Sequence, residues 1–191
     1  GEISTEMTHL SGEVQQIEQL DSIKERIISL ESKGRIISHA QLSSTTSQYP
    51  TEKGEFLRLD SVDSLQGALE FDPRRDPTKL ISQGEGTLML LVAPQIRRAP
   101  EYDGEACFTM WIMVNGSDLA NSSIKECFHE GEPWRDTRVS ILQAVLPMHE
   151  GEIVQIAMRS HPSGQIGAVA IKPDDVPLVP AAIVSVFRLG G

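Results

Sequence analysis

Residues 108–123 constrain the fold more than any other part of the sequence. They comprise an apolar extended segment, a turn at Asn115-Gly116 and a more polar extended segment. Alternate residues of the first segment put apolar side chains on both of its faces. One face carries Phe108, Met110, Ile112 and Val114, and the other carries Thr109, Trp111 and Met113. Two nearly apolar faces predict a strand buried on both sides, as in a sandwich core or a subunit interface.

From residue 35 onward, every candidate element is short and extended. Turn signals such as Asp72-Pro73, Glu150-Gly151 and Pro162-Ser163-Gly164 separate the elements. The expected strands are 56–59, 68–71, 80–81, 87–96, 107–114, 124–128, 139–146, 153–158, 167–171 and 182–189. Ten short strands predict an all-β sandwich or jelly roll. The last strand is strongly apolar, so we expect it to be central in its sheet and its deletion to abolish folding.

Residues 3–30 have a different pattern, with apolar residues three or four positions apart and polar residues between them. The apolar positions are Ile3, Met7, Leu10, Val14, Ile17, Leu20, Ile23, Ile27 and Leu30. So narrow a stripe favours an oligomeric coiled coil over a helix packed on its own domain, and its mixture of residues leaves a trimer open. Gly34 is a stop signal. We therefore predict a stalk at 1–34 and a β-sheet head at 35–191.

Three patterns in the head resemble the jelly roll shared by tumour necrosis factor and the complement globular heads. They are the strand and Val-Asn-Gly turn of residues 110–123, the Leu-Pro-x-x-x-Gly-Glu-x-Val-x-Ile pattern of 146–156, and the closing segment 176–189. The chain departs from the complement heads in lacking a collagen tract and in having only 5% aromatic residues. The resemblance implies a homotrimer of ten-stranded jelly rolls that binds other molecules and is not an enzyme.

A trimeric stalk joined to a trimeric head is typical of a fibre head or adhesin, outside the cell or on a cell or virion surface. We expect such a head to recognise a surface protein or glycan of a target cell. In a trimer, the Trp111 face of the 107–114 strand would meet a neighbouring subunit. The chain begins with Gly1 rather than Met, which indicates part of a longer fibre. The alternatives are a structural capsid or fibre assembly module and, less favoured, a cupin-like metalloenzyme.

The segment 129–136 holds the best candidate for ligand binding. Trp134 lies beside Arg135 in a proline-containing loop that begins at His129. A tryptophan there can stack on a sugar or anchor a protein contact, or it can fold over the end of the sandwich as a lid. The His-Glu-Gly-Glu sequences at 129–132 and 149–152 are interpreted as turns rather than metal sites.

Catalytic and cofactor signals are sparse. The sequence has no Gly-x-Ser-x-Gly elbow and no phosphate loop, and Ser160-His161 lacks a placed acid. We expect no metal or other cofactor, with Ca²⁺ in a loop at Asp174-Asp175, or at Asp60 with Asp63, as the one alternative. The two cysteines, Cys107 and Cys127, are expected to be buried free thiols, although a disulfide between them is possible.

The charge balance argues against nucleic acid as a partner. The chain has 17 Lys and Arg against 27 Asp and Glu, a net charge of -10, and no basic run. The pairs Arg74-Arg75 and Arg97-Arg98 are interpreted as solvated loop or strand-end charges. No apolar run approaches the roughly 18 residues of a membrane span, so we expect no membrane insertion.

Overall fold

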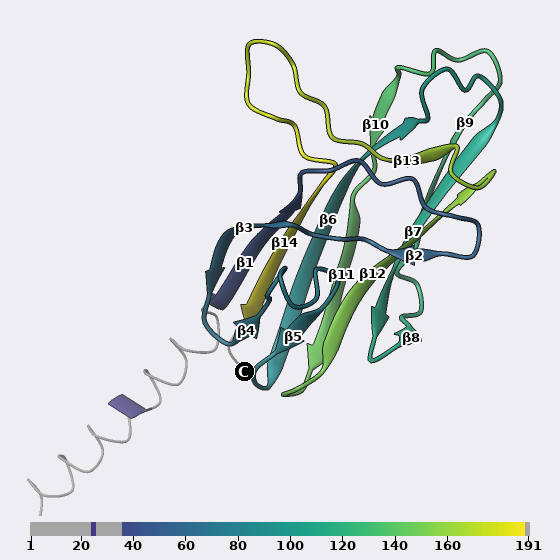
Figure 1. The fold of residues 1–191 in the computed structure, drawn as a ribbon. Helices are drawn as coiled ribbons and strands as arrows, with labels where there is room; N and C mark the ends of the chain where they lie inside the picture. The colour runs from purple at the N-terminus through teal and green to yellow at the C-terminus, as the bar shows by residue number, and fades with distance from the viewer. Residues whose placement is uncertain (1–23, 26–35, 190–191) are drawn as a thin grey trace, which may run out of the picture. The chain divides into compact units, whose positions relative to one another are not determined.

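The computed structural model describes residues 24–25 and 36–189 (Figure 1). Residues 24 and 25 are helical, and Ile36–Leu189 form a compact unit of their own with fourteen strands. None of these residues forms a helix long and apolar enough to cross a membrane. The apolar positions assigned to the coiled coil lie outside the described residues: Ile3, Met7, Leu10, Val14, Ile17, Leu20, Ile23, Ile27 and Leu30.

One seven-stranded antiparallel sheet, here called sheet I, is built around the long strand β6. β14 and β11 pair with opposite edges of β6, and β1 and β3 extend the sheet beyond β14. The short strands β10 and β13 pair with the far end of β6. The strands are β1 (Ile36–Ser44), β3 (Ser61–Gln66), β6 (Gly86–Arg98), β10 (Thr137–Val139), β11 (Leu142–Met148), β13 (Ile166–Ala168) and β14 (Ala182–Leu189).

The second sheet, sheet II, also has seven antiparallel strands and is built around β7 and β12. β9 and β8 pair with the free edge of β7, while β5 and β2 pair with β12. The strands are β2 (Glu55–Phe56), β4 (Leu69–Glu70), β5 (Leu80–Ser82), β7 (Ala106–Val114), β8 (Ser117–Asp118), β9 (Ile124–Phe128) and β12 (Ile153–His161). Figure 1 shows the two sheets as the layers of a sandwich.

The strand pairing is nested. β1 pairs with β14, β5 with β12, β6 with β11 and β7 with β9, so the first strands pair with the last and the middle strands with each other. This arrangement results when one long hairpin is folded over on itself, which is the jelly-roll topology. The predicted all-β sandwich is therefore confirmed, and its connectivity is that of a jelly roll.

The core lies between the inward faces of the two sheets. Phe108, Met110 and Ile112 of β7 are completely buried, which confirms the inward face predicted for this strand. They belong to one apolar cluster with residues of sheet I such as Leu90 and Val184. The opposite face of β7 is only half-buried in the chain by itself, because its residues point away from the core. Asn115 and Gly116 both have positive φ, as their predicted hairpin turn requires.

The predicted ranges 124–128 and 182–189 coincide with β9 and β14. β14 lies between β1 and β6, which confirms its central place. The total of ten strands was wrong, however, because β1, β3 and β8 were not predicted and the run 139–146 divides into β10 and β11. The missed strands are mostly polar, and pairing with neighbours rather than apolar alternation defines them. Ser38 of β1, for example, is buried and its Oγ accepts a hydrogen bond from the amide of Ala68 at 2.8 Å.

Candidate functional site

Two guanidinium groups lie close to the ring of Trp134. The Cζ atoms of Arg97 and Arg135 are 5.0 Å and 5.1 Å from the centre of its ring. A cation at this distance from an indole face is attracted by the electron density of the ring. Arg97 belongs to β6, whereas Arg135 follows Trp134 in the 129–136 segment, here called the Trp134 loop. The Trp134 side chain is half-buried.

Arg98 anchors the Trp134 loop to β6. Its side chain is completely buried, and Nη1 donates to the carbonyl oxygens of Asp103 at 3.0 Å, Gly104 at 2.9 Å and His129 at 3.2 Å. Nη2 donates to the carbonyl oxygen of Glu132. The expectation that Arg98 is a solvated strand-end charge was therefore wrong. The guanidinium loses its water when it is buried, and carbonyl oxygens from two loops replace that water as hydrogen-bond acceptors.

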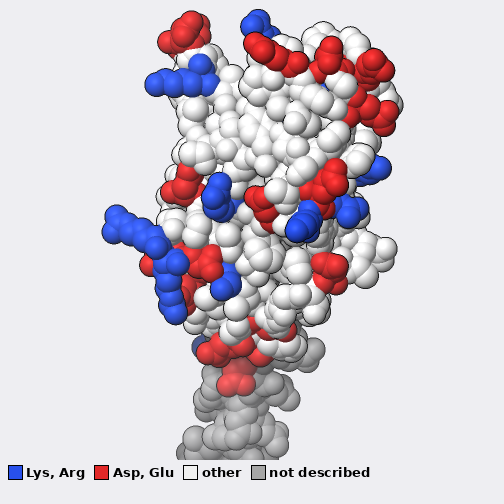
Figure 2. All heavy atoms as spheres, turned by 45° about the vertical axis from the view of Figure 1, so that its right-hand side comes forward, with Lys and Arg blue, Asp and Glu red and all other residues white. Residues whose placement is uncertain are grey.

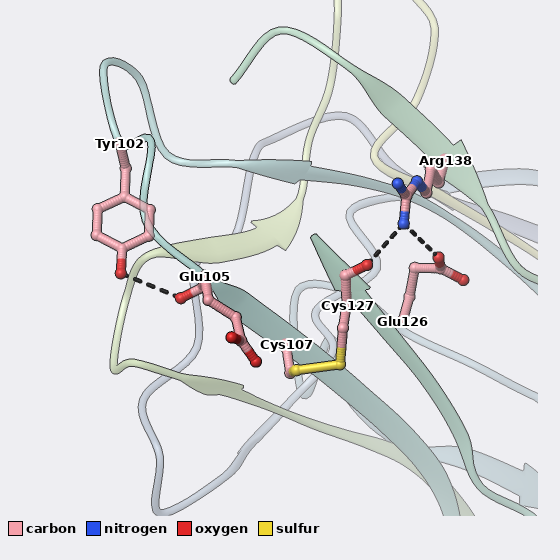
Figure 3. Close-up of a disulfide and its surroundings, with 6 residues drawn as sticks. All are labelled: Tyr102, Glu105, Cys107, Glu126, Cys127 and Arg138. Atoms are coloured by element: carbon pink, nitrogen blue, oxygen red, sulfur yellow. Dashed lines mark hydrogen bonds and ion pairs between the residues drawn. A yellow bond between two sulfur atoms is a disulfide. The ribbon is translucent and has the colours of Figure 1, made fainter. Parts of the chain in front are cut away.

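A second arginine, Arg138, also holds the Trp134 loop in place. Arg138 donates from Nη2 to Glu132 Oε2 at 2.6 Å. Its Nη1 donates to Glu126 Oε1 at 2.9 Å and to the carbonyl oxygen of Cys127 at 2.6 Å (Figure 3). The hydrogen bond to Glu126 is the largest contribution that raises the pKa of Arg138 above its ordinary value. Its guanidinium also lies 4.2 Å from the ring centre of Phe128. The loop is thus held by arginines on two sides.

His129 contributes to this site through its backbone. Its carbonyl oxygen accepts from Arg98 and from the amide of Glu132 at 3.3 Å, while its side chain is exposed. Among the described residues, no hydrogen bond or ion pair involves the His129 ring. The structure therefore brings Arg135 to Trp134, but it shows no interaction of the His129 side chain with either residue.

Both His-Glu-Gly-Glu segments are turns, as predicted. Gly131 and Gly151 each have a φ of +83°, and the amide of Glu152 donates to the carbonyl oxygen of His149 at 3.3 Å. The His149 ring is exposed, with Nδ1 2.5 Å from Glu85 Oε2. This hydrogen bond, with the charge of Glu85, raises the pKa of His149.

The carboxylates considered for calcium have partners of their own. Asp60 accepts hydrogen bonds from the amide of Thr45 at 2.7 Å and from its hydroxyl at 2.8 Å, and Asp63 accepts from Ser61 at 2.8 Å. Asp174 and Asp175 are exposed. Within residues 24–25 and 36–189, no three His, Cys, Asp or Glu side chains gather as a metal site would require. Calcium at these positions stays a prediction.

The two cysteines form a disulfide. Cys107 of β7 lies directly opposite Cys127 of β9, and the sulfur atoms are 2.06 Å apart (Figure 3). The expectation of free thiols was wrong. The register of the β7–β9 pair brings the cysteines together, and that register depends on the intervening segment 115–123, which the residue spacing alone does not define.

Sequence reasoning also missed a group on the outward face of sheet II. Arg159 of β12, Thr109 of β7 and Lys125 of β9 lie in one row across three neighbouring strands. Trp111 follows Thr109 on the same outward face of β7. These residues are far apart in sequence, and no local motif links them. Charged side chains of both signs are interspersed on the face of the molecule shown in Figure 2.

Comparison with known proteins gives no family assignment. No protein-family model matches the sequence, and no curated protein matches it. Among solved structures, the crystal structure of murine APRIL at pH 8.5 aligns with a TM-score of 0.48 and 10% sequence identity. The alignment covers 80% of this chain and 98% of that chain.

Proposed function

We propose that this chain is the head of a homotrimeric surface fibre or adhesin, outside the cell or on a cell or virion surface, which recognises a protein or glycan of a target cell. The proposal rests chiefly on the outward face of sheet I. In the interior of a sheet, side chains that face water are usually polar. Here the central strands of sheet I present apolar side chains outward instead.

The apolar face is formed by three adjacent strands. Phe187 of β14, Met89 of β6 and Val145 of β11 are direct neighbours in one row. Ile183 and Ala93 form a second row on the same face. Val145 is 62% exposed, and the other four side chains are half-buried. The row between these two rows joins Leu91 to Ser185 and Gln143, so the two apolar rows meet at Leu91. Apolar side chains gathered on the outside of a sheet are typical of contacts between proteins, which supports self-association through sheet I.

The β13–β14 connection adds to this surface. It projects from the sandwich as a narrow arm in Figure 1 and is closed by a bridge between Ile171 and Val179. Val176 is 51% exposed and Leu178 is 37% exposed. Apolar side chains on a projecting arm are well placed to contact a second subunit.

In this proposal the Trp134 loop recognises the protein or glycan of the target cell. The half-buried indole lies close to two guanidinium groups, and Arg98 and Arg138 hold its loop by hydrogen bonds. A rigid aromatic group loses little entropy on binding and can stack on a sugar or fill a pocket of a partner protein.

Sedimentation velocity tests the oligomeric state. We expect the full chain to be trimeric at micromolar concentration, and a monomer would contradict the proposal. The predicted stalk can hold a trimer together even when the contact through sheet I is lost. Both contacts are therefore disrupted, the sheet I contact by Met89→Asp and the stalk by Ile17→Asp, each alone and together. Either substitution alone is expected to loosen the trimer, and the pair is expected to give monomers with a native circular dichroism spectrum. Arg74→Asp, which places the same charge on an exposed position between β4 and β5, away from the outward face of sheet I, is the control.

Glycan arrays and cell-binding assays test recognition. Trp134→Ala is expected to weaken binding without lowering thermal stability. If stability falls instead, Trp134 is a lid and the assignment of the ligand site is wrong. If the native chain is silent in both assays, the structural assembly module becomes the better interpretation.

A further inference from the structure

We infer that the outward face of sheet II carries a binding site for an acidic saccharide, formed around Arg159, Lys125 and Trp111. This inference goes beyond the proposed function, because the site uses neither the Trp134 loop nor the self-associating face of sheet I. The Trp111 face of β7 then binds a saccharide rather than a neighbouring subunit, which replaces the expectation from the sequence, and the site is present in a monomer as well as in a trimer.

Two adjoining hollows define the site. One, of about 440 Å³, is lined by Lys125, His161 and Glu52 among others. The other, of about 310 Å³, is lined by Trp111 and by the segment that follows β8. Thr109 and Arg159 line both hollows, so these form one groove across the face of sheet II. Each hollow is within the size range typical of small-ligand sites.

The middle of the groove is positively charged. Arg159 and Lys125 lie directly on either side of Thr109, and both cationic side chains are exposed. Neither forms an ion pair with any residue that the structure describes. Directly opposite side chains in a sheet start about 5 Å apart, so the two cations bracket the Thr109 hydroxyl. A carboxylate or sulfate placed there can accept hydrogen bonds from all three side chains.

The acidic residues around the groove leave this middle position open to an anion. Glu52 is paired with His161, whose Nδ1 lies 2.9 Å from Glu52 Oε1. Asp118 accepts the indole N–H of Trp111 at 2.7 Å. Glu105 is four residues from Thr109 along β7, which is about 13 Å at the usual rise of a strand. The acids thus stand at the ends of the groove, and the unpaired cations stand at its centre.

Trp111 supplies an apolar surface next to the cations. Its ring is half-buried, and its hydrogen bond to Asp118 fixes the orientation of the indole. Gly54 borders the ring so closely that a Cβ at position 54 would be 3.4 Å from Cη2. Asn121 and Ser123 add exposed polar side chains on the far side. An aromatic surface surrounded by hydrogen-bonding groups suits a sugar ring, which has apolar C–H faces and a hydroxyl rim.

The backbone of sheet II favours a saccharide over a peptide. An extended peptide usually binds by adding a strand to a free sheet edge. Here the groove crosses the middle of the sheet, where β7 is already paired with β12 on one side and with β9 on the other. The ligand must therefore be bound by side chains alone.

Fluorescence titration of the full chain tests the inference. The sequence has two tryptophans, so in Trp134→Phe the emission reports on Trp111 alone. The probes are a heparin-derived hexasaccharide, oligogalacturonate, neutral maltohexaose and an oligoglutamate peptide. We expect one of the acidic saccharides to bind and to change the Trp111 emission. Arg159→Gln and Lys125→Gln should each weaken binding about tenfold, because each removes a charged hydrogen bond. The matched controls Arg74→Gln and Lys172→Gln remove exposed cations elsewhere and should leave binding unchanged.

Four results would overturn the inference: no acidic saccharide binds, maltohexaose binds equally well, oligoglutamate binds better than both acidic saccharides, or binding is insensitive to Arg159 and Lys125. Circular dichroism of each variant verifies that it is folded. Saccharide binding that is lost only in Trp134→Ala would leave the proposed function intact and remove this site. Conversely, a monomeric chain that binds through Arg159 would keep this site and contradict the proposed trimer.

Discussion

The buried guanidinium of Arg98 donates a hydrogen bond to the carbonyl oxygen of His129 across 3.2 Å, and this bond ties β6 to the Trp134 loop. Arg98→Met keeps the length of the side chain but leaves several carbonyl oxygens without their donor. We expect the free energy of unfolding to fall by about 3 kcal/mol or more. Urea denaturation measures this loss. Arg74→Met, which removes an exposed guanidinium, is expected to change stability very little, and a similar loss in both variants would contradict the role of Arg98.

Gly167 of β13 is in close contact with the backbone of the segment that contains Gln48. A Cβ at this position would lie 2.9 Å from the carbonyl carbon of Gln48 and closer still to its oxygen. Gly167→Ala must therefore move the segment that pairs Gln48 with Ala168. Gly131→Ala is the matched control, because its Cβ meets open space and only the positive φ opposes it. We expect the control to cost about 1 kcal/mol and Gly167→Ala to cost clearly more in urea denaturation.

Reduction of the Cys107–Cys127 disulfide should lower stability without preventing folding at low temperature. The bond closes a loop with a sequence separation of 20 residues. For a loop of this length, the loss of entropy in the unfolded chain corresponds to about 3 kcal/mol. Urea denaturation with and without a phosphine reductant measures the difference. The variant with both cysteines changed to alanine should match the reduced protein and should no longer respond to the reductant.

The patterns that were read correctly from the sequence are local and apolar. The alternation in 182–189 and the Asn115-Gly116 turn depend on neighbouring residues, so they predicted β14 and the turn at the end of β7. β1 and β3 carry many polar residues. β1 is a strand because β14 offers a pairing edge, and β3 is a strand because β1 offers the next one. Such pairing joins residues that are far apart in the chain, which periodicity does not reveal.

The residues of the candidate site also fall into two groups, those that a local pattern predicts and those that only the fold brings together. Trp134 and Arg135 were found because they are neighbours in a loop with turn residues. Arg97, whose guanidinium also lies near the ring, comes from β6, and only the fold brings it there. The buried role of Arg98 was also hidden, because an arginine at a strand end is usually solvated. The pairing register of β7 with β12 and β9 likewise places Arg159, Thr109 and Lys125 in one row.

The carboxyl group of Asp76 should titrate far below an ordinary aspartate. Its hydrogen bond from the Thr78 hydroxyl at 2.7 Å, together with the Lys79 ammonium at 2.9 Å, lowers its pKa to about 2. Because the folded value lies below the unfolded value of 3.8, this stabilisation is complete above that pH and is lost as the pH falls towards 2. Carbon-13 NMR of the carboxyl group measures the pKa directly. Thr78→Val should raise it, whereas Thr137→Val is a control without this contact.

Deletion of β14 should abolish folding of the head. β14 lies between β1 and β6 and pairs with both along its length. Ala182, Val184 and Val186 are buried in the core cluster, so their removal opens sheet I and exposes the inward face of sheet II. No other strand can replace β14, because an edge strand such as β3 would have to leave its own partner. A chain that ends at residue 181 is therefore expected to lack dispersed amide signals in a proton–nitrogen NMR spectrum. A chain that ends at residue 189 is the control and should give the spectrum of the full chain. A well-dispersed spectrum from the shorter chain would show that the remaining strands form the sandwich by themselves.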